Sequence, residues 1–91
     1  MNNDKLIKVK NLIADENAIK ARELFQTIEP ENTVLYFFVQ GLLEQKFQQW
    51  GAAINSFQKV LELDSGHLEA KNHIYMLQSV LNFWNPETFN P

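Results

Sequence analysis

Two histidines are the residues of this 91-residue chain whose type most readily supports catalysis or metal binding. His67 and His73 lie six positions apart. Two histidines that bind one metal ion from a single helix need a spacing of three or four residues, because only those positions share a helix face. The spacing therefore predicts no metal site. We expect a loop or capping role for His67 at a helix start, and a partly exposed helical position for His73.

The acidic residues and glycines also lack the pattern of an active site. Carboxylates are dispersed along the chain, with no pair isolated among apolar residues that could act as general acid and base. There is no glycine-rich phosphate loop, nucleophile elbow or metal-binding helix motif. Cysteine is absent, which excludes thiolate metal sites and disulfides. We therefore expect no enzyme, no catalytic residue, no metal and no cofactor.

The charge of the chain is uneven. Residues 1–22 carry five basic and three acidic residues, a balance of +2, whereas residues 23–91 carry three basic and eight acidic residues, a balance of −5. The simplest interpretation is solvated helix faces. The alternative is head-to-tail attraction between copies, or a partner with a basic patch. Nucleic acid is not expected as a partner, because the basic residues are few and scattered.

Length and hydropathy indicate one small domain over residues 1–91. Apolar residues make up 45 % of the chain and include seven Phe and two Trp, which is enough for a core and too much for a disordered protein. The N-terminus lacks the apolar stretch of a signal peptide, and no run approaches the ~18 apolar residues of a membrane span. We expect a cytoplasmic protein without membrane contact.

Apolar residues recur with helical spacing nearly throughout, and proline and most glycines fall between the helical segments. No segment alternates with period two for long enough to be a strand, so the prediction is an all-α fold. The expected helices are 4–13, 16–28, 34–47, 50–63 and 67–82. We expect Asp15 to cap the second helix, Asn32 or Thr33 the third, and Ser65 the fifth.

Small and aromatic residues follow a recognisable order within residues 34–67. They are Gly41, Trp50, Ala53, Phe57 and Leu61. This order resembles the helix–turn–helix repeat of the tetratricopeptide (TPR) family, in which small residues lie where two helix backbones approach. The chain departs from the family at Gln40, Glu44 and Ser65, where the repeat has Leu, Tyr and Pro.

The first half of the chain matches the second at a shift of 35 residues, which is close to the family's repeat length. At this shift Ala18 falls on Ala53, Ile28 falls on Leu63, and Arg22 takes the place of the aromatic Phe57. The resemblance implies a TPR-like α-solenoid of antiparallel helix pairs. Its parts would be a degenerate repeat over 4–30, a better repeat over 34–67, a capping helix over 67–82 and a tail over 83–91.

Protein binding is the function that the resemblance implies, because the first helix of each TPR repeat lines a concave groove for a peptide or helix. The groove positions that carry over best are Leu35, Phe38, Leu42, Gln45, Lys46, Asn72 and Met76. Further positions are Ile7, Lys10, Asn11, Glu69 and Val80. Members that bind chaperone tails have polar clamp residues where this chain has Phe38 and Leu42, so an apolar ligand surface is favoured.

Six consecutive apolar residues, 34–39, cover more than a helical turn and must be buried on more than one side. The expected cover is the chain's own tail, a second copy or another protein.

The tail holds Phe83, Trp84 and Phe89 around two Asn–Pro pairs. We expect Phe83 and Trp84 to pack on the preceding helices, with groove occupation or exchange between chains as alternatives. A homodimerising structural unit is the alternative function.

Overall fold

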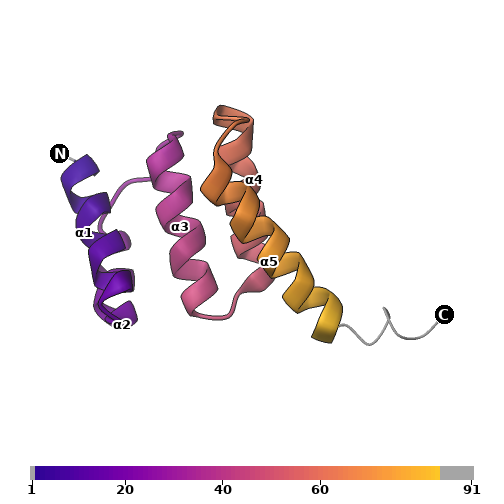
Figure 1. The fold of residues 1–91 in the computed structure, drawn as a ribbon. Helices are drawn as coiled ribbons and strands as arrows, with labels where there is room; N and C mark the ends of the chain where they lie inside the picture. The colour runs from indigo at the N-terminus through magenta and orange to yellow at the C-terminus, as the bar shows by residue number, and fades with distance from the viewer. Residues whose placement is uncertain (1, 85–91) are drawn as a thin grey trace.

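The computed structural model describes the backbone of residues 2–84 and the side chains of residues 2–82. Over these residues the chain forms five helices and no strand, so the predicted all-α fold is confirmed. The helices are α1 (Asn2–Ala14), α2 (Ala18–Phe25), α3 (Val34–Lys46), α4 (Trp50–Leu63) and α5 (Leu68–Trp84) (Figure 1). The predicted bounds of α3 and α4 are right to within one residue, whereas α2 is shorter at both ends than predicted.

The turn after α1 explains why α2 begins late. The backbone N–H of Asn17 donates to the carbonyl of Leu12 at 2.8 Å, and the N–H of Glu16 donates to Ile13 at 3.1 Å. Glu16 has a φ of 60°, and together these features form a Schellman helix end. Asp15 therefore belongs to the end of α1, and its predicted role as the cap of the second helix is wrong.

The end of α2 is set by residues that do not favour a helix. The hydroxyl of Thr27 donates to the carbonyl of Leu24 at 2.7 Å, which closes a turn beyond Phe25. Pro30 then biases the residue before it towards extended backbone. Ile28 lies outside the helix but is still in the core, with 5 % of its surface exposed.

The helix caps confirm two expectations and correct a third. The Thr33 hydroxyl accepts a bond from the Tyr36 N–H at 3.2 Å, as predicted for the start of α3. At the start of α5, the Nδ1 atom of His67 accepts a bond from the Ala70 N–H at 3.1 Å. The capping role of His67 is therefore confirmed, and the predicted cap at Ser65 is wrong.

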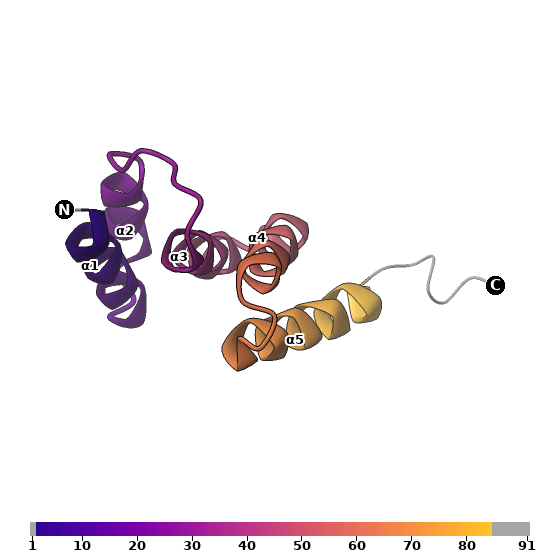
Figure 2. The ribbon, with the colours of Figure 1, turned by 90° about the horizontal axis from the view of Figure 1, so that it is seen from above.

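Helix α3 lies in the middle of the molecule, with α1 and α2 on one side and α4 and α5 on the other (Figure 2). Tyr36, Val39 and Leu43 of α3 join a hydrophobic cluster with α1 and α2. Phe38 joins a second cluster with α4 and α5. The chain's own helices thus bury Tyr36, Phe38 and Val39 and leave the other three residues of the run 34–39 half-buried. This corrects the expectation that the tail or another chain must cover the second side of the run.

The spacing of the helix pairs differs from the predicted 35 residues. Helices α1 and α3 begin 32 residues apart, at Asn2 and Val34, and α2 and α4 also begin 32 residues apart. A shift of 32 pairs the fully buried Ala21 with Ala53, and it places Phe25 opposite Phe57 where the predicted shift placed Arg22. The two shifts differ by three residues, which returns nearly to the same helix face, so the apolar pattern alone does not separate them.

Gly41 sets the distance between α3 and α4. A Cβ atom at position 41 would lie 2.7 Å from Cε1 of the Phe57 ring, which is closer than real contacts allow. Phe57 is fully buried, so its ring has no free space to move into. The two helices therefore approach as closely as they do because residue 41 has no side chain.

Replacing Gly41 with Ala should lower the free energy of unfolding by about 1–2 kcal/mol, since overpacking (roughly 1–3 kcal/mol) outweighs the gain in helix propensity of up to about 1 kcal/mol. Gly51 is the matched control, because a Cβ there would meet no atom within 4 Å. Gly51→Ala should leave stability unchanged or raise it by up to about 1 kcal/mol. Urea denaturation measures both changes, and equal effects of the two substitutions would contradict this packing account.

Candidate functional site

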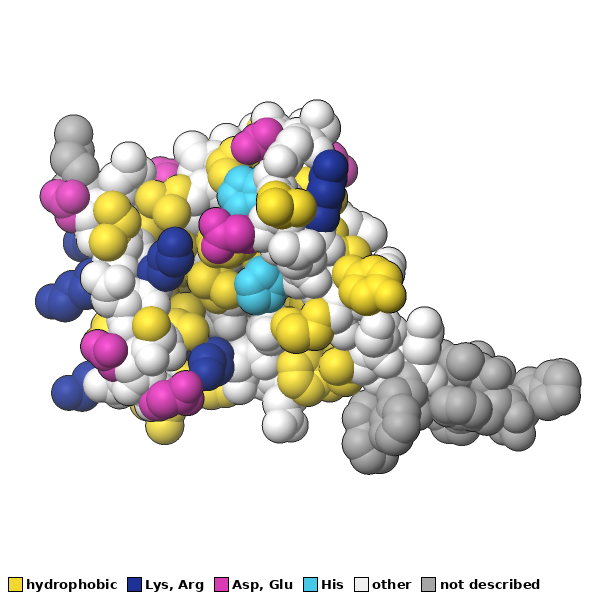
Figure 3. All heavy atoms as spheres, viewed as in Figure 1, with side chains coloured by type: hydrophobic (Ala, Val, Ile, Leu, Met, Phe, Trp, Pro, Cys, Tyr) yellow, Lys and Arg dark blue, Asp and Glu magenta, His cyan; other side chains and the backbone are white. Residues whose placement is uncertain are grey.

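Side chains from α1, from α5 and from the turn before α5 meet around the ring of Phe38 of α3, and we call the surface formed by Lys10, Phe38, His67 and His73 the inner face. Figure 3 shows the two histidine side chains on this side of the molecule. Lys10 of α1 lies with its Nζ atom 5.6 Å from the ring centroid. The ring of His67 lies 5.1 Å away and that of His73 lies 5.9 Å away, centroid to centroid. The floor of the inner face is therefore apolar, and its visible surface mixes histidine, charged and hydrophobic side chains.

The predicted groove residues of α3 have different degrees of exposure. Leu35 and Leu42 are half-buried and pack against the core clusters. Phe38 is only 4 % exposed, so it forms the floor of the inner face and offers a ligand little surface. On α5, Asn72 is exposed and Met76 is 44 % exposed.

Two polar contacts tie the predicted groove residues to other helices. The side-chain oxygen of Gln45 lies 2.9 Å from Nδ1 of His73, which links α3 to α5. The Nζ atom of Lys46 lies 3.1 Å from a carboxylate oxygen of Glu16, which links α3 to the turn after α1. This ion pair is solvent-exposed and contributes little to stability. The part-buried contact with His73 therefore fixes the side chain of Gln45 on the inner face.

His73 is a half-buried residue of α5, as predicted, and an aromatic contact fixes its ring. Its ring stacks on Phe57 at a centroid distance of 4.8 Å and an interplanar angle of 19°. Burial lowers the pKa of His73 below its ordinary value, and the nearby Glu69 carboxylate acts weakly in the opposite direction. Sequence reasoning missed this role, because the aromatic contacts join residues 16 positions apart.

The predicted cap contacts of Phe83, Trp84 and Phe89 lie outside the described side chains.

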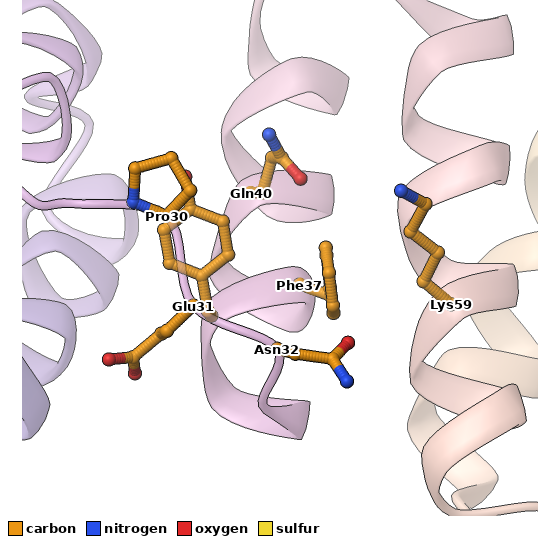
Figure 4. A pocket seen from close by; sticks show the side chains of 7 residues that line it. Pro30, Glu31, Asn32, Phe37, Gln40 and Lys59 are labelled. Atoms are coloured by element: carbon orange, nitrogen blue, oxygen red, sulfur yellow. The ribbon is translucent and has the colours of Figure 1, made fainter.

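A first cavity of about 440 Å³ lies away from the inner face, beside the start of α3 (Figure 4). Pro30, Phe37 and Gln40 line it, and Lys59 reaches it from α4. The Nζ atom of Lys59 is 5.1 Å from the centroid of the Phe37 ring, a cation–π contact. Tyr36 lines the same cavity, and the pKa of its hydroxyl is raised by burial and by the charge of nearby carboxylates.

A second cavity of about 360 Å³ lies between α2 and the C-terminal half of α3, and we call it the outer pocket. Gln40 lines both cavities, and the outer pocket adds Glu44, Arg22, Phe25 and Phe47. The sequence contained one signal for this pocket, since Gln40 and Glu44 are departures from the TPR pattern. Their spacing of four residues puts them on the same face of α3.

The described residues contain no group of three or more His, Cys, Asp or Glu side chains that could hold a metal ion. None of their helices is both long enough and apolar enough to cross a membrane. Comparisons with models of protein families, with curated proteins and with solved structures gave no match for this chain.

The lowered pKa of His73 makes stability depend on pH. The folded state favours the neutral ring, so this contribution is present above the ordinary pKa of 6.5 and is lost as the pH falls through the lower folded pKa. His73→Gln should remove the contribution while leaving the other titrating groups in place. We expect the stability difference between wild type and His73→Gln, measured by urea denaturation, to change between about pH 7.5 and about pH 5. A constant difference would contradict the burial of the neutral ring.

Proposed function

We propose that the chain is a small protein-interaction module of TPR-like helix pairs that binds a peptide or a helix of a partner protein on its inner face. The turns within the helix pairs support the repeat. Glu16 and Gln48 follow the first helix of each pair, and both have a φ of 60°. The Schellman bond also recurs, since the N–H of Gln49 donates to the Glu44 carbonyl at 2.9 Å.

The observation that carries the proposal is the meeting of three separate helices around Phe38. Lys10, His67 and His73 come from distant parts of the sequence, and each lies within 6 Å of this ring by centroid or Nζ distance. No single helix pair contains all of them. A ligand on this face would contact α1, α3 and α5 together, which is the geometry of a helix or extended peptide lying across a row of helices.

The chemistry of the inner face suits a mixed apolar and polar ligand. Leu42 and Met76 offer partly exposed apolar surface, and full burial of such a side chain is worth roughly 1.5–3 kcal/mol. The flexible thioether of Met76 can adapt to the shape of a partner. Lys10 and Asn72 are exposed and surround this surface with hydrogen-bond donors. We propose these four residues, with Gln45, as the contact set.

Peptides that bind the immobilised wild-type chain are first selected from a random library. Their affinity for Met76→Glu should be about tenfold or more lower than for the wild type, because a buried charge without a partner is strongly unfavourable. Gln58→Glu, at an exposed position on α4, is the control with the same added charge. Fluorescence anisotropy with labelled peptides measures both variants. Equal affinity of the wild type and Met76→Glu for every selected peptide would show that ligands bind elsewhere.

A second candidate function is self-association, which the exposed apolar surface of α5 favours. Leu68 is 67 % exposed and Tyr75 is 76 % exposed, and both lie on this helix. Helix α5 packs mainly on α4, and no further helix follows it within the described residues. Two and a half repeats also fall short of the roughly three that repeat proteins usually need.

Sedimentation distinguishes self-association from the binding of a separate partner. If α5 forms the contact, the wild type should dimerise with rising micromolar concentration, and Tyr75→Lys should shift the equilibrium towards the monomer. Gln58→Lys adds the same charge at an exposed position of α4, outside the proposed contact, and serves as the control for surface charge. A monomeric wild type over the whole concentration range would eliminate this second candidate.

A further inference from the structure

We propose that the outer pocket is a binding site for an organic cation, the side-chain ammonium of a lysine or guanidinium of an arginine presented by a partner protein. The site lies apart from the inner face and is a second point of recognition. It is built around the carboxylate of Glu44, with the carboxamide of Gln40 beside it and the rings of Phe25 and Phe47 as walls.

The carboxylate of Glu44 is fixed by a buried partner. The Ser56 hydroxyl of α4 is 5 % exposed and donates to Oε1 of Glu44 at 2.5 Å. The same hydroxyl lies 3.3 Å from the Gln40 side-chain oxygen, but it has a single hydrogen, and the shorter contact identifies Glu44 as the acceptor. Ser56 therefore holds one oxygen of the carboxylate, while the group as a whole lines a cavity that can admit a ligand.

No basic side chain of the described residues lies within 4.0 Å of the Glu44 carboxylate. The single ion pair within 4.0 Å in this part of the chain joins Lys46 to Glu16. Burial raises the pKa of the Glu44 carboxyl, and the bond from Ser56 opposes this only in part. A half-buried carboxylate without a cation is unfavourable to folding, and an aliphatic or aromatic residue at this helix position would avoid that loss. A bound ammonium or guanidinium would compensate it with a charge-assisted hydrogen bond.

Arg22 is the other charged residue of the outer pocket, and its position shows how a cation can lie against a wall of the pocket. Its guanidinium carbon lies 4.4 Å from the centroid of Phe47, so a wall of the pocket already accepts a cation on its aromatic face. Arg22 is solvent-exposed, and its charge is screened by water and salt. Its position at the pocket makes it an internal competitor of the ligand, since an arginine and a carboxylate that share a cavity attract each other.

The full chain, labelled with 15N, is titrated with Nα-acetyl-lysine methylamide and Nα-acetyl-arginine methylamide, and with the norleucine analogue as the neutral control. We expect saturable amide shifts for residues 22–26 and 40–49 with either cation, and the stronger of the two identifies the preferred group. Glu44→Gln keeps the shape of the pocket and should weaken binding about tenfold, the equivalent of one charge-assisted bond. Glu62→Gln removes an exposed carboxylate of α4 and should bind like the wild type.

The absence of saturable shifts in the wild type would overturn the proposal. Equal binding of the norleucine analogue, or equal binding of the cations by Glu44→Gln, would overturn it too. Arg22→Gln should bind the cations at least as tightly as the wild type. Binding that appears only in this variant would show that Arg22 itself fills the pocket. Met76→Glu, on the inner face, should leave cation binding unchanged and so separates this site from the proposed peptide-binding function.

Discussion

The close approach of α3 and α4 at Gly41 is the contact on which the remaining structure depends. The ring of Phe57 fills the space that a side chain at position 41 would need, and it is fully buried there. The same ring stacks on His73 of α5. One aromatic side chain thus connects three helices, and a change in its position would be transmitted to all of them.

The central position of α3 follows from its apolar sequence and explains both proposed sites. Tyr36, Val39 and Leu43 bury one side against α1 and α2, and Phe38 buries another against α4 and α5. Two narrower stripes of α3 are left partly uncovered. One, with Leu42 and Gln45, belongs to the inner face, and the other, with Gln40 and Glu44, lines the outer pocket. The two sites lie on different sides of a single helix, so a ligand bound at one site would not block the other.

The sequence was sufficient for the features that depend on local chemistry. The bounds of α3 and α4, the Thr33 cap and the burial of Ala53 and Phe57 follow from helical spacing and from capping preferences. The sequence was insufficient for the turn after α1. Glu16 occupies a left-handed position that favours glycine, so nothing in its side chain marked the true end of α1. The predicted shift between the two helix pairs was therefore wrong by three residues, a difference that preserves the apolar face of α2.

The two proposed sites could not be predicted from the sequence, because they depend on contacts between helices. Gln40 and Glu44 stood out as polar residues at positions where the TPR pattern is apolar, but their partner Ser56 belongs to the next helix. The stacking of His73 on Phe57 likewise joins two helices and leaves no trace in the spacing of either. Such contacts depend on how helices are placed against each other, which periodicity within one helix does not determine.

A double-mutant cycle between Gly41 and Phe57 tests the central contact most directly. The variants are Gly41→Ala, Phe57→Leu and the two combined, and urea denaturation gives the free energy of unfolding of each. If the Phe57 ring is what excludes a side chain at position 41, the smaller leucine should make Gly41→Ala less destabilising by about 1 kcal/mol or more. Effects that add to within about 0.5 kcal/mol would contradict the account.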